Sequence, residues 1–544
     1  MKKSFVLFVF CALTLSASAS LELPKFFSSR MVLQREATIP FFGKAAPGAT
    51  VKVSFAGQNH ETKADSEGRW EVRLQPLAPT KEGRDLTIVA DGETLVLNDI
   101  LVGDVWVCAG QSNMEFSFGW NPLERDRFAA EADTMPQIRT IRIVRGTAPF
   151  PDSDLAYLPN FLAEKKGWHP TTQKEECFDM VTCAGWFFAR RIVKETDLAI
   201  GLINTSWSAS SIGPFIPPEA FSDEPELAGL AQKVQACLPN TEEGRAALET
   251  YVRQMKQWRQ ETAAALKEGR TPEQKNPPRF DQLNTLYLGD RYNRMVYPLT
   301  RFPVKGVIWY QGCANSRLGE AYLPLYRALV NGWRKAWGID LPFYAVQLAS
   351  FWNNWRRVDS VEGGDGFTLI REAQRKGLSV PNTGLAVTID IGEPFEIHPR
   401  EKYHVGERLA LWALRNQYGK DVVVSGPLYR SLSVDGSEAR ISFDYAETGL
   451  MAGVKKVTDN NDPEEAPAGT PLKGFAIAGA DRKWHVADAR IDGTQVVVSS
   501  PEVPEPVAVR YAFHGAPECN LYNRAGLPAS PFRTDDWPCP LANQ

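Results

Sequence analysis

A serine that follows an apolar run is the first residue of this chain that could act as a nucleophile. Residues 105–109 (Val-Trp-Val-Cys-Ala) predict a buried strand. Gly110 then allows a sharp turn, and Ser112 follows two positions later. Reactive groups of α/β proteins lie where such strands end. Met114 stands where the nucleophile elbow G-x-S-x-G has its last glycine. Ser112 is therefore a candidate nucleophile in a turn of another kind.

An activated serine requires a general base within hydrogen-bonding reach. The chain has 6 histidines. His398 is singled out because it follows a late apolar run by a short acidic loop and precedes Pro399. Proline is favoured at the first position of a helix, so we expect His398 at the mouth of a helix. We expect packing or surface roles for the other five: His60, His169, His404, His485 and His514.

The elements that must position these two side chains are apolar runs alternating with helical stretches, from about residue 100 to 420. Runs without strict polar alternation, separated by helices, predict a parallel sheet covered on both faces. Ser112 and His398 follow different runs, so we expect them at the same edge of the sheet. After the run before Ser112, the predicted strands are residues 199–204, 304–310, 342–348 and 385–390.

Both flanks of this core are rich in β-signals. Residues 20–99 predict an N-terminal β domain of sandwich type, and residues 421–544 a C-terminal β-rich region. Residues 458–469, rich in Asp, Glu, Pro and Ala, predict an exposed loop. Whether the flanks pack together or stand apart is left open. The clearest strands in them are residues 50–55, 70–74, 421–424, 439–443, 495–498 and 507–511.

An insertion at about residues 218–280 separates two predicted core strands. Apolar residues recur in it at helical spacing from Leu248 to Leu266, with charged residues between them. This pattern predicts an amphipathic helix. Packing against the core is favoured over a lid above the site.

Length and composition restrict the class of protein. A chain of 544 residues exceeds one hydrophobic core, so two or three domains are expected. The net charge of -4 and the absence of a basic stripe exclude a nucleic-acid partner. The 15 tryptophans suit carbohydrate contact, although most are expected in the core. No CxxC or HxH spacing occurs, so no metal or other cofactor is expected.

The first residues predict export. Lys2 and Lys3 form a charged start, residues 5–15 an apolar stretch, and residues 17–19 (Ala-Ser-Ala) a cleavage site. We therefore assign residues 1–19 to a signal peptide and expect a secreted or periplasmic protein. No later stretch reaches about 18 consecutive apolar residues, so no membrane span is predicted.

Seven of the 8 cysteines lie beyond the signal peptide, so at least one thiol is unpaired unless it bonds another chain. In an oxidising compartment the nearest pairs are candidate disulfides. Cys108 lies in the strand before Ser112 and is expected to be a buried, inert thiol. The candidate pairs are Cys177 with Cys183 and Cys519 with Cys539.

Several ordered motifs resemble the sialate O-acetylesterases, a family of the SGNH-hydrolase superfamily. The resemblance runs nearly from end to end of the chain. It implies a flavodoxin-like core of three layers, α/β/α, with associated β domains. It also implies removal of O-acetyl groups from sialic acids, typically at the 9-position. The motifs are residues 31–35 (MVLQR), 110–115 (GQSNME), 203–207 (INTSW), 307–312 (VIWYQG), 390–399 (DIGEPFEIHP) and 526–535 (GLPASPFRTD).

By this resemblance Ser112 is the nucleophile and His398 the general base. Many SGNH enzymes have an aspartate three residues before the histidine, where this chain has Phe395. The acid that orients the histidine could be Asp390, Glu396 or neither.

The resemblance also implies the groups that bind the oxyanion and the substrate. The oxyanion donors are the backbone N–H groups of Ser112 and Ser208 and the side chain of Gln311. Trp207 is a candidate substrate contact. A sialic acid carboxylate calls for a nearby cation, for which Arg371 is the candidate, with a core ion pair as the alternative.

The chain departs from the family at two motifs. Residues 207–210 are Trp-Ser-Ala-Ser where the family has Trp-Gly-Gly-Thr, and Ser208 is less free than glycine to adopt a positive φ. Cys313 replaces the glutamate of Gln-Gly-Glu, which removes a carboxylate beside the site and makes Cys313 a candidate free thiol.

Three hypotheses follow. The first is an exported O-acetylesterase acting on O-acetylated sialic acid, with acetylated xylan or another acetylated glycan as the alternative substrate. The second is a glycan-binding protein that has kept the fold and lost turnover. The third, a purely structural exported protein, leaves the serine and histidine without a purpose.

Overall fold

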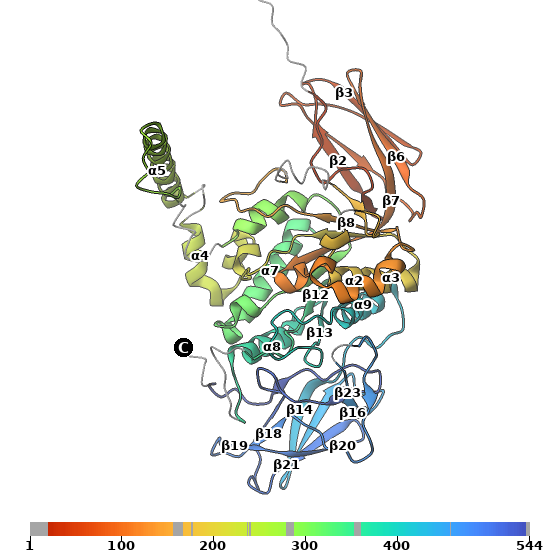
Figure 1. The fold of residues 1–544 in the computed structure, drawn as a ribbon, viewed down its shortest axis with the longest axis vertical. Coiled ribbons are helices and arrows are strands. Elements are labelled where there is room, and N and C mark those ends of the chain that lie inside the picture. Colours follow the sequence, from red (N-terminus) through yellow and green to blue (C-terminus); the bar gives the residue numbers. More distant parts are fainter. Residues whose placement is uncertain are drawn as a thin grey trace, which may run out of the picture.

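The structure is a computed structural model that describes residues 20–155, 167–175, 178–236, 238, 241–278, 288–352, 361–456 and 459–539. An α/β core lies between two β-rich regions, one at each end of the molecule (Figure 1). The two flanks therefore stand apart. The predicted signal peptide lies outside the described residues. No helix within the described ranges is long and apolar enough to cross a bilayer.

The core is built on a sheet with the strand order β13-β12-β11-β7-β10-β8-β9. All neighbours are parallel except β8 and β9, which pair antiparallel at one edge. The predicted parallel sheet is confirmed, although the last predicted strand begins and ends earlier than expected. The strands are β7 Glu93–Gly110, β8 Ile138–Arg142, β9 His169–Pro170, β10 Ile200–Asn204, β11 Gly306–Tyr310, β12 Phe343–Val346 and β13 Thr383–Ala386.

One strand, β7, runs through both the N-terminal region and the core. Its first part pairs antiparallel with β6, and its second part pairs parallel with β10 and β11. The predicted domain boundary at residues 99 and 100 falls inside this strand, so it does not mark a linker. From Ile100 onward every residue of β7 is buried, as expected for a strand covered on both faces. The N-terminal region is thus joined to the core by continuous backbone pairing.

The N-terminal region packs a two-stranded sheet, β2 with β5, against strands β3, β4 and β6. Alternate residues of β3 and β5 are buried, which produces the apolar layer expected of a sandwich. The strands are β1 Val32–Gln34, β2 Ile39–Lys44, β3 Thr50–Phe55, β4 Gln58–Lys63, β5 Arg69–Leu74 and β6 Arg84–Ala90.

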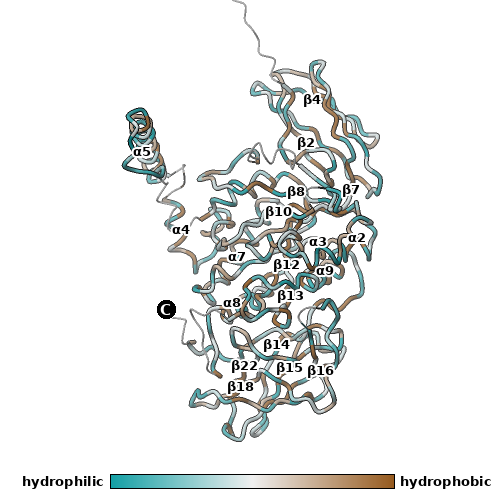
Figure 2. The backbone as a smooth tube through the Cα atoms, viewed as in Figure 1, coloured by the Kyte–Doolittle hydropathy of each residue, from teal (hydrophilic) through white to brown (hydrophobic). Residues whose placement is uncertain are grey.

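Helices cover both faces of the core sheet. On one face Trp106 of β7 packs edge-to-face on Phe188 of α3, with ring centroids 4.9 Å apart. Trp309 of β11 points to the other face, where it packs on Trp333 of α7 at 6.4 Å. Figure 2 shows hydrophobic stretches along these strands. The helices are α1 Ser112–Glu115, α2 Pro122–Ala132, α3 Cys183–Thr196, α7 Tyr322–Trp337, α8 Gly366–Lys376 and α9 Tyr403–Tyr418.

The C-terminal region has an apolar cluster of its own. Residues 421–424 form no strand, so that prediction is wrong, and Val424 packs against the core. The predicted loop is mostly exposed from residue 459 onward. The strands are β14 Leu428–Asp435, β15 Glu438–Asp444, β16 Leu450–Val454, β17 Glu464–Glu465, β18 Phe475–Ala478, β19 Trp484–Val486, β20 Asp488–Asp492, β21 Gln495–Ser499, β22 Ala508–Tyr511, β23 Leu521–Asn523 and β24 Phe532–Arg533.

The insertion forms helices α4 (Ala228–Gln235) and α5 (Glu242–Lys267). The predicted amphipathic helix is confirmed as α5. Its favoured packing against the core is wrong, because α5 stands apart from the sheet in Figure 1. Val252 and Leu266 of α5 are 55% and 68% exposed.

The cysteines correct the disulfide prediction. Cys519 and Cys539 are both free thiols, so they form no bridge. Cys183 is also a free, buried thiol, and Cys177 lies outside the described residues. Cys108 is buried as predicted, and its burial raises the pKa of the thiol far above the ordinary value.

Candidate active site

Ser112 lies at the carboxyl end of β7, in the middle of the sheet. The chain turns at Gly110, whose φ is +131°. A Cβ at this position would lie 2.2 Å from the Tyr310 carbonyl oxygen, so only glycine fits. The Gln111 N–H then donates to the same carbonyl at 3.0 Å. Ser112 begins the short helix α1 with 7% of its surface exposed.

His398 meets this serine. The His398 Nε2 lies 2.8 Å from the Ser112 Oγ, so the structure brings together the two residues that the sequence singled out. The loop that carries His398 follows β13, at the same edge of the sheet as Ser112. The predicted helix does not start at Pro399, because α9 begins only at Tyr403. The histidine is therefore held by loop contacts and not by a helix terminus.

Of the two candidate acids, Glu396 lies beside the imidazole. Its Oε1 accepts the backbone N–H of His398 at 2.8 Å and lies 3.5 Å from the Nδ1. Asp390 is committed elsewhere, since its two oxygens bind the Arg408 guanidinium at 2.6 and 2.7 Å. Asp390 and Arg408 are both almost completely buried. Of the alternatives left open for the orienting acid, Asp390 is thus contradicted, and its carboxylate instead anchors α9.

The surroundings of His398 lower the pKa of its imidazole. Burial is the largest cause, and the Lys402 ammonium acts in the same direction, whereas Glu396 opposes both. The imidazole is therefore neutral at pH 7. A neutral imidazole 2.8 Å from a hydroxyl can accept its proton.

Two side chains that sequence reasoning missed hold the histidine loop against α1. The Asn113 Nδ2 donates to the Ile397 carbonyl at 2.9 Å. The fully buried Lys402 Nζ donates to the Asn113 Oδ1 at 2.9 Å and also to the Pro399 carbonyl. Asn113 lies within the motif of residues 110–115, which was a usable signal. Nothing local marks Lys402, whose role depends on its burial.

Gln311 does not offer its amide to the serine. Its Nε2 donates to the Ser210 carbonyl at 3.0 Å and to the Asn315 Oδ1 at 2.7 Å, and its Oε1 accepts from the Tyr322 hydroxyl. Both amide hydrogens are therefore used. The predicted oxyanion role of Gln311 is contradicted, and the side chain instead fixes the loop around Ser210.

Ser208 is also engaged elsewhere. Its backbone N–H donates to the Glu115 Oε2 at 2.8 Å, and its hydroxyl donates to the same oxygen. Ser208 does not adopt the positive φ that glycine would permit there, whereas the next residue, Ala209, has φ +58°. Within the described residues the N–H groups of Ser112 and Ala209 have no acceptor. The Ser208 N–H and the Gln311 amide are therefore occupied, whereas these two backbone N–H groups are not.

Glu115 organises a cationic pair beside the serine. Its side chain is 2% exposed and accepts from the guanidinium groups of Arg142 and Arg145. Each arginine side chain is more than a third exposed (37% and 38%). Arg142 ends β8, and β8 is separated from β7 by β10 alone. One carboxylate shared by two guanidinium groups leaves one positive charge facing solvent.

Of the two predicted substrate contacts, only Trp207 has part of its surface exposed. It is half-buried, in the loop after β10, with the Arg291 guanidinium 4.4 Å from its ring centroid. Arg371 is fully buried. Its guanidinium donates to four backbone carbonyls, so the predicted substrate contact is contradicted and the side chain holds loops together. These carbonyls belong to Leu348, Ala349, His514 and Gly515.

Cys313, which replaces the family's glutamate, lies close to Asn113 and Lys402. It is a free thiol, as expected, and burial raises its pKa to about 12. The buried Lys402 ammonium therefore has no carboxylate at this position. In the part of the chain that the structure describes, no group of three or more His, Cys, Asp or Glu side chains could hold a metal ion.

Comparison with known proteins gives the family. No family model matches the chain. Sialate O-acetylesterases from Mus musculus and Homo sapiens are 26% and 27% identical, over 97% and 95% of this chain and 96% and 93% of those proteins. The crystal structure of a carbohydrate acetylesterase from Xanthomonas citri has 33% identity and a TM-score of 0.75, covering 95% of this chain and 100% of that one. The chain belongs to the sialate O-acetylesterase family.

As a member of the sialate O-acetylesterase family, the chain is an esterase. Two of the motifs that carry the family resemblance meet at the site. The Gln111 Oε1 accepts the backbone N–H groups of Gly312 and Ala314 at 3.1 and 3.3 Å. Residues of these two motifs therefore build the turn around Ser112 together.

Proposed function

We propose that the chain is an exported carbohydrate O-acetylesterase that releases acetate from O-acetylated sialic acids, with the 9-O-acetyl group as the expected target. The observation that carries the esterase chemistry is the 2.8 Å contact between the Ser112 Oγ and the His398 Nε2. Export rests on the sequence of residues 1–19, and N-terminal sequencing of the mature protein tests it.

In the proposed reaction His398 removes the Ser112 proton as the Oγ attacks the acetyl carbonyl. The negative charge on the carbonyl oxygen is bound by the N–H groups of Ser112 and Ala209, each worth roughly 3 kcal/mol in the transition state. His398 then protonates the departing sugar oxygen, which leaves an acetyl group on Ser112. A water molecule activated by the same imidazole releases acetate and restores the serine.

Three other side chains keep this pair in position. Glu396 lies beside the Nδ1, so it favours the tautomer in which the Nε2 accepts a proton. Asn113 and Lys402 tie the histidine loop to the helix that begins at Ser112. Because they act through His398, they are positioning residues.

Two observations support sialic acid as the substrate. The mouse and human relatives are named sialate O-acetylesterases. The arginine pair around Glu115 offers a partly exposed positive charge at the serine's edge of the sheet. Guanidinium groups bind carboxylates in a planar, two-bonded geometry. The carboxylate of a sialic acid would find its partner there, and the buried Arg371 would not be needed.

An acetylated neutral glycan such as xylan is the second candidate. The relative from Xanthomonas citri is named a carbohydrate acetylesterase, and this name does not mention sialic acid. A neutral substrate would make no use of the arginine pair. The hypothesis of a glycan-binding protein without turnover is refuted if acetate release depends on Ser112.

The deciding experiment compares acetate release from 9-O-acetylated sialic acid and from acetylated xylobiose. Wild type should favour the sialic acid. In Arg145→Gln the ratio of the two kcat/KM values should fall about tenfold, because one exposed charge-assisted contact is lost. Release from xylobiose alone would transfer the proposal to neutral glycans. If no acetate is released from either glycan and an aryl acetate also stays uncleaved, the esterase mechanism is refuted.

A further inference from the structure

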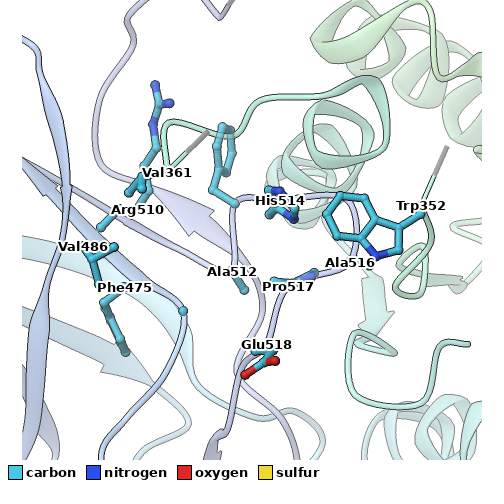
Figure 3. Close-up of a pocket in the computed structure, with 13 residues that line it drawn as sticks. Trp352, Val361, Phe475, Val486, Arg510, Ala512, His514, Ala516, Pro517 and Glu518 are labelled. Carbon is cyan, nitrogen blue, oxygen red and sulfur yellow. The ribbon is translucent and has the colours of Figure 1, made fainter. Parts of the chain in front are cut away.

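A cavity opens between the core and the C-terminal region (Figure 3). It measures about 420 Å³, within the usual range of small-molecule sites of about 300–1,000 Å³. Its wall includes Trp352 from the core and Phe475, Val486, His514 and Glu518 from the C-terminal region. We call it the interdomain pocket. It does not include Ser112 or His398.

The interdomain pocket is connected to the active site through the histidine loop. Trp352 follows β12, and its backbone N–H donates to the Pro394 carbonyl at 2.6 Å. Pro394, four residues before His398, belongs to a tight turn that is closed by a β-bridge between Glu393 and Glu396. The wall of the pocket and the base that touches Ser112 are therefore built on adjoining loops at one edge of the sheet.

An exposed aromatic ring lies on this connecting turn. Phe395 is 79% exposed, and no other large hydrophobic side chain of the described residues is more exposed. Val486, which lines the pocket, is 71% exposed. Large apolar side chains are therefore exposed both on the connecting turn and at the pocket, where a ligand could cover them.

The chemistry of the pocket fits a sugar ring. The Trp352 and His514 rings meet edge-to-face with centroids 4.5 Å apart, and Figure 3 shows them side by side on the pocket wall. Pyranose rings have apolar C–H faces that lie on aromatic rings, and hydroxyl groups around their edge. The Glu518 carboxylate, bound to Lys473 at 2.9 Å, is a polar group of the same wall.

We propose that the interdomain pocket binds a further sugar residue of the glycan whose acetyl group lies at Ser112. The glycan would run from the serine over Phe395 to Trp352 and His514. The enzyme would then recognise an acetylated oligosaccharide in preference to an isolated acetylated monosaccharide. This inference rests on the proposed carbohydrate esterase function, and it adds a subsite formed with the C-terminal region.

The test is binding to the full chain carrying Ser112→Ala, so that the ligand is not turned over. Titration calorimetry compares 9-O-acetylated sialic acid with a 9-O-acetylated sialyl-trisaccharide. Covering about 60 Å² of apolar surface corresponds to roughly tenfold in affinity, so the trisaccharide should bind about tenfold more tightly. Trp352→Ala should reduce this ratio to near one.

A second variant covers the case in which Trp352→Ala does not fold. Val486→Asp changes an exposed side chain and places a charge in the apolar pocket, so it should also abolish the preference for the trisaccharide. Val454→Asp is the matched control, because Val454 is 53% exposed on β16 and does not line the pocket. It should keep the full preference.

The outcomes separate this inference from the proposed function. Equal affinity for the two sialic compounds, or a preference that survives both pocket variants, overturns the subsite and leaves the esterase intact. If neither sialic compound binds, the same ratio is measured with acetylated xylose and acetylated xylotetraose. A ratio near one for that pair also overturns the subsite. If the wild type does not hydrolyse an aryl acetate, the esterase function itself is refuted.

Discussion

Replacing Lys402 with methionine tests whether a buried ammonium joins the serine helix to the histidine loop. Lys402 has no exposed surface, and its Nζ lies 4.7 Å from the centroid of the Phe116 ring. Burial lowers the pKa of this ammonium from 10.5 to about 8. At 1.36 kcal/mol for each pKa unit, that difference corresponds to about 3 kcal/mol. Methionine has a similar length and carries no proton.

The sign of the effect follows from proton binding. The unfolded chain keeps the Lys402 proton up to about pH 10.5, whereas the folded protein releases it near pH 8. Between these values the unfolded state binds more protons, so this group makes the wild type more stable as the pH rises. Below pH 8 both states are protonated and the contribution of Lys402 is constant. In Lys402→Met the contribution is absent throughout.

The assay is urea unfolding followed by tryptophan fluorescence, for wild type and Lys402→Met, from pH 7 to pH 10.5. The free energy of unfolding of the wild type should rise relative to that of the variant by about 3 kcal/mol over this range. The control is Lys52→Met, since the Lys52 side chain is 62% exposed, and its difference from wild type should stay flat. A difference for Lys402→Met that is equally flat would refute the burial of a charged lysine at this position.

Three further predictions concern the histidine, one buried ion pair and the described thiols. The acid limb of the pH profile of kcat/KM reports the pKa of His398. It should move to higher pH in Lys402→Met and to lower pH in Glu396→Gln, because the two charges act on the imidazole in opposite directions. Shifts of the same sign would contradict these assigned effects. Asp390→Asn should lower the free energy of unfolding by about 3 kcal/mol, because the buried Arg408 loses its charged partner, and unchanged thermal stability would show that the ion pair is unimportant. The described thiols should resist iodoacetamide at pH 7.5 until urea is added, because burial raises their pKa values and the thiolate is the reactive form. Peptide mass spectrometry measures the labelling, and labelling of any of them in the folded protein would contradict the prediction. These thiols are Cys108, Cys183, Cys313, Cys519 and Cys539.

The parts of the fold that depend on local pattern could be predicted from the sequence. The run before Ser112 is buried and ends at a glycine because a covered parallel strand needs continuous apolar residues and then a turn. His398 could be singled out because few histidines compete with it. Their meeting at one edge follows from parallel topology, which places the ends of all strands together.

The errors concern where polar side chains point. The hydrogen-bonding groups of Gln311 and Arg371 are occupied by backbone carbonyls far along the chain, among them those of Ser210 and His514. Asp390 lies in the loop that leads to His398, but its carboxylate binds Arg408 of α9 and not the imidazole. No local pattern records such partners, since they form only when distant loops pack. The spacing of Cys519 and Cys539 along the chain likewise does not determine how far apart the two thiols lie in the fold.

The central claim is that Ser112 and His398 act together as the nucleophile and its base. The most direct measurement is steady-state acetate release from an aryl acetate by wild type, Ser112→Ala and His398→Ala. Such an ester needs no glycan contact, so the result depends on the reacting groups alone. Each variant should lose on the order of 10⁴-fold or more in kcat, because residues that act as a unit fail together. Acetate release near the wild-type rate by either folded variant would contradict the account.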